Sequence, residues 1–232
     1  MKYLVLISFI SVFFLSPVYS QEKNSNKHTQ IRKVSPFDKV KAMKGINVTL
    51  VEGTKEQVEV LIENGSPNDV VTDIKNQELT VKMKTKIYKN VAVQVYVTYV
   101  TLRELKAGTG ATIDAENPVA ADKLTMDAGT DAKIKLEVDV NAIEANVSAG
   151  RVELSGTAKS QLIKANAGGK YLAFELESED VEAKANTGGR IEITVSKSLK
   201  ATVSNGGDVI YKGNPPKITK KISMGGKVEA AE

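Results

Sequence analysis

Pairs of adjacent glycines are the residues of this chain that most resemble a chemical motif, because glycine-rich loops can bind phosphate through their backbone amides. The sequence reads KANAGGKYLAF around Gly168-Gly169 and KANTGGRIEI around Gly188-Gly189. A phosphate loop needs glycines that end a strand and begin a helix, whereas a second strand pattern follows each doublet here. Neither doublet precedes a Gly-Lys-Ser or Gly-Lys-Thr sequence. We therefore interpret the doublets as structural corners rather than as a nucleotide site.

Carboxylates near equivalent turns are the second candidate for chemistry. Asp114, Asp127, Asp131 and Asp208 occupy such positions. Glycoside cleavage needs two or three carboxylates within roughly 5 to 10 Å of one another. The first three acids could meet on neighbouring turns of a repeating fold, but no basic residue at a matched position completes a lyase site. We expect solvated corner acids, and a polysaccharide lyase or hydrolase is the alternative.

The composition excludes several kinds of catalytic and metal centre. The 232 residues include no cysteine, no tryptophan and a single histidine, His28. Ser-His-Asp and Cys-His catalysis and most zinc sites are therefore excluded, and no metal or cofactor is expected. The formal net charge is +4, and the lysines mostly alternate with apolar residues, as in LTVKMKTK. This alternation indicates the solvated face of strands rather than the clustered basic stripe that binds nucleic acid.

The first 20 residues have the pattern of a secretory signal peptide. Lys2 precedes an apolar run from Tyr3 to Leu15, and a small-residue exit ends at Ser20. The run is shorter than the roughly 20 residues that a membrane span needs. We expect cleavage after Ser20, no transmembrane segment in the remaining chain, and a periplasmic, cell-surface or secreted location. Residues 21–34 are polar and are predicted to form a disordered lead-in.

A repeat of about 19 residues runs through the chain after residue 100. Each unit can be aligned on a small residue that closes a turn, and these markers are 18 to 21 residues apart. An apolar or aromatic residue lies two positions after each marker, and another apolar residue lies seven to nine positions before it. The markers are Ala111, Ala132, Gly150, Gly169, Gly189, Gly207 and Gly226, and the preceding apolar residues are Leu102, Leu124, Ile143, Leu162, Val181, Leu199 and Ile218.

Units of this length cannot bury a core alone, but stacked strand-turn-strand units can. The pattern predicts an all-β fold, a parallel β-solenoid of about seven coils over residues 101–232, with rungs about 4.8 Å apart. Residues 35–100 contain four alternating strands, and Ser66-Pro67 predicts one short helical turn. We expect residues 35–100 to form the opening sheet and cap of a single domain, 35–232. The glycine corners of the coils are Gly150, Gly168-Gly169, Gly188-Gly189, Gly206-Gly207 and Gly225-Gly226.

Two asparagines occupy the same place in successive repeats. Asn166 and Asn186 each lie two residues before the first glycine of a doublet. In stacked coils such side chains can hydrogen-bond from rung to rung, and their partners are then part of the stack. We favour this short asparagine ladder over a ligand-binding role.

The order of segments resembles a known family. Gly45-Ile46-Asn47 follows FDKVKAMK, and LRELKAGTGATI and serial glycine-containing turns come later. Together they resemble the head GIN domain family of putative auto-transporter adhesins, over about Phe37 to Val228. The resemblance implies a bacterial exported protein, a right-handed parallel β-helix-like fold and an adhesin role, and it brings no catalytic residues. Where the family often has Gly-Ala or Gly-Ser at its turns, this chain has Gly-Gly.

These patterns together predict a non-catalytic, exported binding domain, adhesin-like or a scaffold of the cell envelope. A solenoid offers long lateral faces that suit contact with a protein, a glycan or a lipid surface. Its exposed strand edges make a homodimer plausible. The sequence names no particular ligand.

Overall fold

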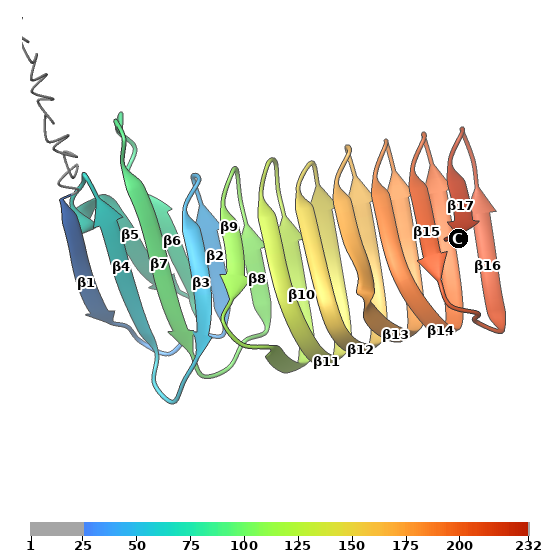
Figure 1. Cartoon of the computed structure of the whole chain (residues 1–232), viewed down its shortest axis with the longest axis horizontal. Helices are drawn as coiled ribbons and strands as arrows, with labels where there is room; N and C mark the ends of the chain where they lie inside the picture. The colour runs from blue at the N-terminus through green and yellow to red at the C-terminus, as the bar shows by residue number, and fades with distance from the viewer. Residues whose placement is uncertain (1–25, 232) are drawn as a thin grey trace, which may run out of the picture.

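The structure, a computed structural model, describes residues 26–231 and is built almost entirely of β-strands (Figure 1). The expected signal peptide lies outside the described residues. One short turn, η1, separates two of the strands, and no described helix is long and apolar enough to cross a membrane. The elements are β1 Lys27–Lys33, β2 Lys39–Met43, β3 Asn47–Glu52, β4 Gln57–Glu63, η1 Pro67–Asp69, β5 Val70–Lys75, β6 Glu78–Met83, β7 Ala92–Tyr99, β8 Glu104–Ala107, β9 Thr112–Ala115, β10 Val119–Ala128, β11 Lys133–Ser148, β12 Arg151–Asn166, β13 Lys170–Asn186, β14 Arg190–Ser204, β15 Asp208–Lys212, β16 Lys217–Ile222 and β17 Lys227–Ala230.

The strands wind into a flattened coil with two opposed faces, which Figure 1 shows in front and behind. The first face contains β3, β9, the first halves of β11 to β14, β15 and β17, all paired in parallel. The second face contains β2, β8, most of β10, the second halves of β11 to β14, and β16. The predicted all-β solenoid of about seven coils is confirmed.

The predicted apolar column forms one continuous stack inside the coil. Ile134 lies beside Val152 in the register, and the pairing continues coil by coil to Val228. Every member is buried, because side chains alternate across each strand and this set faces inward. The stack consists of Ile113, Ile134, Val152, Tyr171, Ile191, Val209 and Val228.

The second predicted column is wrong in register at one position, and its last member, Ile218, is 40% exposed. Leu162 pairs with Glu144 and lies on the outer surface, whereas Gln161 occupies the inward place beside Ile143. Gln161 is only 3% exposed and accepts a hydrogen bond from the Tyr171 hydroxyl. Its amide also contacts the Ser178 hydroxyl. A buried polar side chain is tolerated here because the neighbouring coil satisfies it.

The coils are joined at one edge by tight turns that contact one another. The amide of Gly189 donates to the carbonyl of Asn186 at 3.1 Å, which closes the turn. The amide of Gly188 donates to the carbonyl of Asn205 in the next turn at 3.2 Å. Equivalent hydrogen bonds join the turn tips in series, and in each the amide of the first residue donates to the carbonyl of the second. The pairs are Gly45 and Thr109, Gly110 and Thr130, Asp131 and Ala149, Ala149 and Asn166, Gly168 and Thr187, and Gly206 and Met224. The backbone of each tip is therefore bonded to the next coil.

The two glycines of a doublet are required for different reasons. Gly188 has a φ of +71°, which residues with a side chain, asparagine excepted, rarely adopt, but a Cβ there would make only an ordinary van der Waals contact, 4.0 Å from the amide nitrogen of Gly168. Gly189 has no such φ, and its Cβ would lie 2.2 Å from the carbonyl oxygen of Ala165 in an earlier coil. The first glycine thus provides the turn, and the second allows the coils to approach.

The amino-terminal strands do not follow chain order. The coil formed by β2 and β3 is inserted between β6 and β8 on one face and between β7 and β9 on the other. The chain then forms β4 to β7 beyond it before returning to β8. The turn of this inserted coil contains Lys44 and Gly45, both with positive φ. The Gly45-Ile46-Asn47 motif is therefore a further corner of the same edge, with Ile46 fully buried.

The lead-in predicted to be disordered is partly a strand. Residues 27–33 form β1, which pairs antiparallel with β4. The Arg32 guanidinium donates to the carbonyls of Val70 at 2.8 Å and Pro67 at 2.7 Å. Backbone pairing to an edge strand needs few apolar side chains, so the polar composition of this segment did not reveal it. The predicted helical turn is confirmed as η1, with Ser66 as its N-cap.

Substitution of the second doublet glycine should be far more damaging than substitution of the first. We expect Gly189→Ala to lower the free energy of unfolding by more than about 2 kcal/mol, because its methyl group would overlap a backbone carbonyl. Gly188→Asn should cost less than about 1 kcal/mol, since asparagine tolerates positive φ. Urea denaturation followed by circular dichroism measures both. Equal losses in the two variants would contradict the division of roles.

Loss of the Tyr171 hydroxyl should destabilise the coil although the side chain keeps its ring. Tyr171→Phe leaves the buried Gln161 oxygen without this donor, and we expect a loss of about 1 to 3 kcal/mol in unfolding free energy. Tyr96→Phe removes a hydroxyl from a partly exposed side chain and serves as the control. Thermal unfolding of both proteins tests this, and an unchanged melting temperature for Tyr171→Phe would argue against the buried network.

Candidate functional site

The predicted asparagines have equivalent positions but different side-chain contacts. Asn166 and Asn186 each accept the closing hydrogen bond of their turn through the backbone carbonyl. The side-chain oxygen of Asn186 accepts from the Ser204 hydroxyl at 2.9 Å and from the Asn205 amide at 3.0 Å, both in the next coil. Among the described residues, no side-chain hydrogen bond joins Asn166 to Asn186. The side-chain hydrogen bonds therefore join Asn186 to the coil that follows it in the chain.

The four candidate acids do not converge. Asp114 lies in β9 on the first face, whereas Asp127 lies in β10 on the second face and accepts from the Asn146 amide at 3.1 Å. Asp131 is at a turn tip with a φ of +53°. Asp208 begins β15, five strands along the first face from Asp114, or about 24 Å at the usual strand spacing. This arrangement does not bring any two of these four carboxylates to one glycosidic bond.

A groove of about 590 Å³ lies on the first face, and Asp114 is at one end of it. One Asp114 oxygen is buried without a hydrogen-bond partner. Leu154 and Phe174 supply apolar lining, and Glu153 lies among them. Burial raises the pKa of Glu153, but hydrogen bonds from Arg151 and Lys133 outweigh it and lower that pKa overall. A glycosidase acid needs a raised pKa, so Glu153 is poorly suited to protonate a leaving group.

A second groove, of about 690 Å³, follows the edge opposite the tight turns. Most of its lining residues are of polar types, and they include Asp139, Thr157 and Glu179. The Thr157 hydroxyl donates to Asp139 at 2.8 Å, and Glu179 pairs with Lys197 at 2.6 Å. These groups satisfy one another between coils. Within residues 26–231, no group of three His, Cys, Asp or Glu residues could hold a metal ion.

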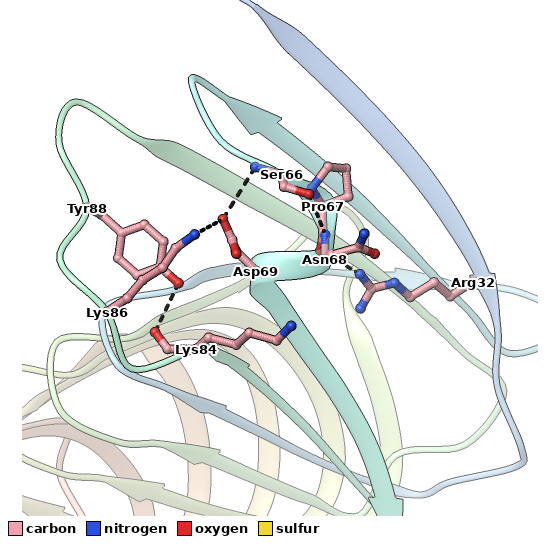
Figure 2. Close-up of polar contacts among 8 residues, drawn as sticks. All are labelled: Arg32, Ser66, Pro67, Asn68, Asp69, Lys84, Lys86 and Tyr88. Atoms are coloured by element: carbon pink, nitrogen blue, oxygen red, sulfur yellow. Dashed lines mark hydrogen bonds and ion pairs between the residues drawn. The ribbon is translucent and has the colours of Figure 1, made fainter.

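The most unusual surface lies in the connection between β6 and β7, and we call its residues 84–90 the basic loop. Ile87 in this loop is 90% exposed. Figure 2 shows the contacts that hold it: Lys86 pairs with Asp69 at 2.7 Å, and the Tyr88 hydroxyl donates to the Lys84 carbonyl at 3.0 Å. Lys86 also lies 5.1 Å from the centre of the Tyr88 ring. Asp69 is thus an anchor for the loop at the end of η1.

Sequence reasoning missed the basic loop although a signal was present. The alternation of LTVKMKTK stops after Met83, and Ile87 does not continue it. The sequence analysis interprets these lysines as part of the solvated face of a strand. An apolar residue outside the alternation, among closely spaced lysines, was the available sign of a projecting loop.

The ion pair between Asp69 and Lys86 predicts a pH-dependent contribution to stability. The hydrogen bond from Lys86 lowers the pKa of Asp69 below its ordinary value of about 3.9. A carboxyl with a lowered pKa stabilises the fold above its ordinary pKa, and the contribution disappears as pH falls through the lower value. Asp69→Asn should therefore be less stable than the wild type near pH 7 and nearly equal to it in strong acid.

Urea denaturation across the acid range tests this expectation. Asparagine keeps an oxygen that can accept from the Ser66 amide, so the comparison isolates the charge. Glu63→Gln, which removes an exposed partner of Lys27, is a matched control and should show a smaller difference. A deficit in Asp69→Asn that persists undiminished in strong acid would mean that the ion pair is not its cause.

Comparison with known proteins supports a single assignment. Solved structures with the same fold include a putative adhesin from Bacteroides fragilis, with a TM-score of 0.79 and 22% identity. The match covers 88% of this chain and 97% of the Bacteroides fragilis chain. A putative adhesin from Parabacteroides merdae has a TM-score of 0.69 and 23% identity, with coverage of 90% and 98%. A putative lipid binding protein from Parabacteroides distasonis has a TM-score of 0.70 and 19% identity, again with coverage of 90% and 98%.

These identities establish a shared fold and nothing further. Comparison with curated protein sequences finds no match. The family model described as "Putative auto-transporter adhesin, head GIN domain" matches residues 36–215, most of the chain, as the resemblance of the Gly45-Ile46-Asn47 segment and the serial turns predicts. The chain therefore belongs to the head GIN domain family of putative auto-transporter adhesins.

Proposed function

We propose that this chain is an exported, non-catalytic binding domain that presents a rigid β-solenoid to a ligand at the cell envelope. The observation that carries the proposal is the distribution of the candidate acids. Asp114 and Asp127 lie on opposite faces, Asp131 is at a turn tip, and Asp208 is several coils away. Binding needs no such convergence, whereas glycoside cleavage does.

The paired carboxyls support the same proposal. Those with a clearly shifted pKa are all shifted downward: Asp69, Glu144, Glu153 and Glu182. Each is bonded to a lysine or arginine, which favours the ionised form. Ionised and paired carboxylates suit a stable surface better than proton transfer. They are the expected state of a scaffold that only binds.

Export and an adhesin-type role rest on the family and on the sequence. Members of this family are described as putative auto-transporter adhesins, and one structural neighbour is described as a putative lipid binding protein. We propose a surface or periplasmic location after removal of residues 1–20. The ligand classes that suit the fold are a glycan, a protein and a lipid surface, because each can lie along an extended face.

An array of glycans and lipids probed with residues 21–232 tests the proposal. These residues retain every described strand, and circular dichroism would verify that they are folded. We expect reproducible binding to one class by the folded protein and none by a heat-denatured sample. A clean null against both classes would count against the adhesin-type role. Turnover of a polysaccharide would contradict the non-catalytic assignment.

A further inference from the structure

The basic loop projects from the edge that carries the tight turns. In Figure 1 the connection between β6 and β7 rises above the neighbouring turns at the amino-terminal end. Ile87 is the most exposed large apolar residue among those described, at 90%. Its side chain therefore adds nothing to the core of the fold. Single exposed apolar residues are common, so Ile87 alone does not indicate a binding surface, and the charges of the loop must be considered with it.

Three further lysines lie in or beside the basic loop that contains Ile87. Lys84 and Lys89 belong to the loop, and Lys44 approaches it from the adjacent corner, where its ammonium donates to the Thr85 hydroxyl at 2.5 Å. None of the three forms an ion pair among residues 26–231, whereas Lys86 is paired with Asp69. The loop thus carries an exposed apolar side chain together with lysines that have no ion-pair partner.

The loop is also braced by hydrogen bonds to neighbouring segments. Besides the contacts of Lys86 and Tyr88, the Asn64 amide donates to the Asn90 carbonyl at 3.1 Å. The amide of Lys84 donates to the Asp69 carbonyl at 2.8 Å. A preorganised tip loses little conformational entropy on binding.

We propose that the basic loop, together with Lys44, docks the protein onto a bilayer that contains anionic phospholipid. Ile87 enters the boundary between headgroups and acyl chains, and Lys44, Lys84 and Lys89 lie against the lipid phosphates. A bilayer offers this combination, an anionic surface above an apolar layer. A protein partner would need a broader apolar patch than one isoleucine. The inference rests on the proposed binding role and names its ligand class.

Vesicle sedimentation tests the proposal with residues 21–232 and two variants. The probes are phosphatidylcholine vesicles with and without phosphatidylglycerol, at low and high salt. We expect binding only to the anionic vesicles, weakened by salt. Lys84→Gln with Lys89→Gln should weaken it at least about tenfold, since each lysine near an anionic surface contributes about fivefold. Ile87→Gln should weaken it by about tenfold.

Matched controls lie at the opposite end of the coil. Lys217→Gln with Lys221→Gln removes the same charge from the exposed strand β16, and Met224→Gln changes an apolar residue that is 78% exposed. Both should bind as the wild type does. Equal losses in the loop and control variants, or no binding to anionic vesicles, would overturn the proposal. If vesicles fail while the array reveals a glycan, this inference is wrong and the proposed binding role stands.

Discussion

Close contact between the backbones of successive corners is the constraint on which the rest of the structure depends. A Cβ at Gly189 would lie 2.2 Å from the Ala165 carbonyl oxygen, so the chain has no space for a side chain at this point. The tips are joined by hydrogen bonds, such as that from Gly188 to Asn205. These contacts fix the distance between coils. Because side chains alternate along each strand, the stacks of buried side chains inside the coil and the exposed side chains outside it then follow.

This regular edge explains how an interior polar group and an outward loop coexist with a stable repeat. Gln161 is accommodated because Tyr171 and Ser178 belong to adjoining strand segments in fixed register. The basic loop is tolerated because it replaces a tight turn at the amino-terminal end, where antiparallel strands have ended the parallel stack. The buried polar side chain thus lies where a neighbouring coil supplies its hydrogen bonds. The basic loop lies where no further parallel coil stacks on the turn. The loop is consequently free to carry a function.

The repeating part of the fold was predictable because its signals are local. A small residue at the corner and an apolar residue two positions later recur in every coil, and both positions hold in the structure. Three features depend on contacts between distant segments and were not predictable. Strand β1 pairs with β4, and the β2–β3 coil is inserted out of chain order. The buried Gln161 side chain accepts a hydrogen bond from Tyr171 in the next coil.

The candidate site was predictable only in part. The sequence placed the glycines at corners, but it left open whether the first three acids meet on neighbouring turns, which the structure shows they do not. It did not reveal that Gly45 belongs to the same edge, because the inserted coil is separated in sequence from its neighbours. It also did not reveal the basic loop, because exposure of Ile87 and pairing of Lys86 depend on the position of Asp69.

Amide hydrogen exchange with and without anionic vesicles tests the account most directly. The account predicts slow exchange at the corner amides of Gly168, Gly188 and Gly206 in both conditions, because each donates to the next coil. It predicts that vesicles add protection at residues 84–90 and leave β11 to β14 unchanged. Rapid exchange at the corner amides would contradict the bonded edge. Protection spread over the faces, with none in the loop, would contradict the proposed docking surface.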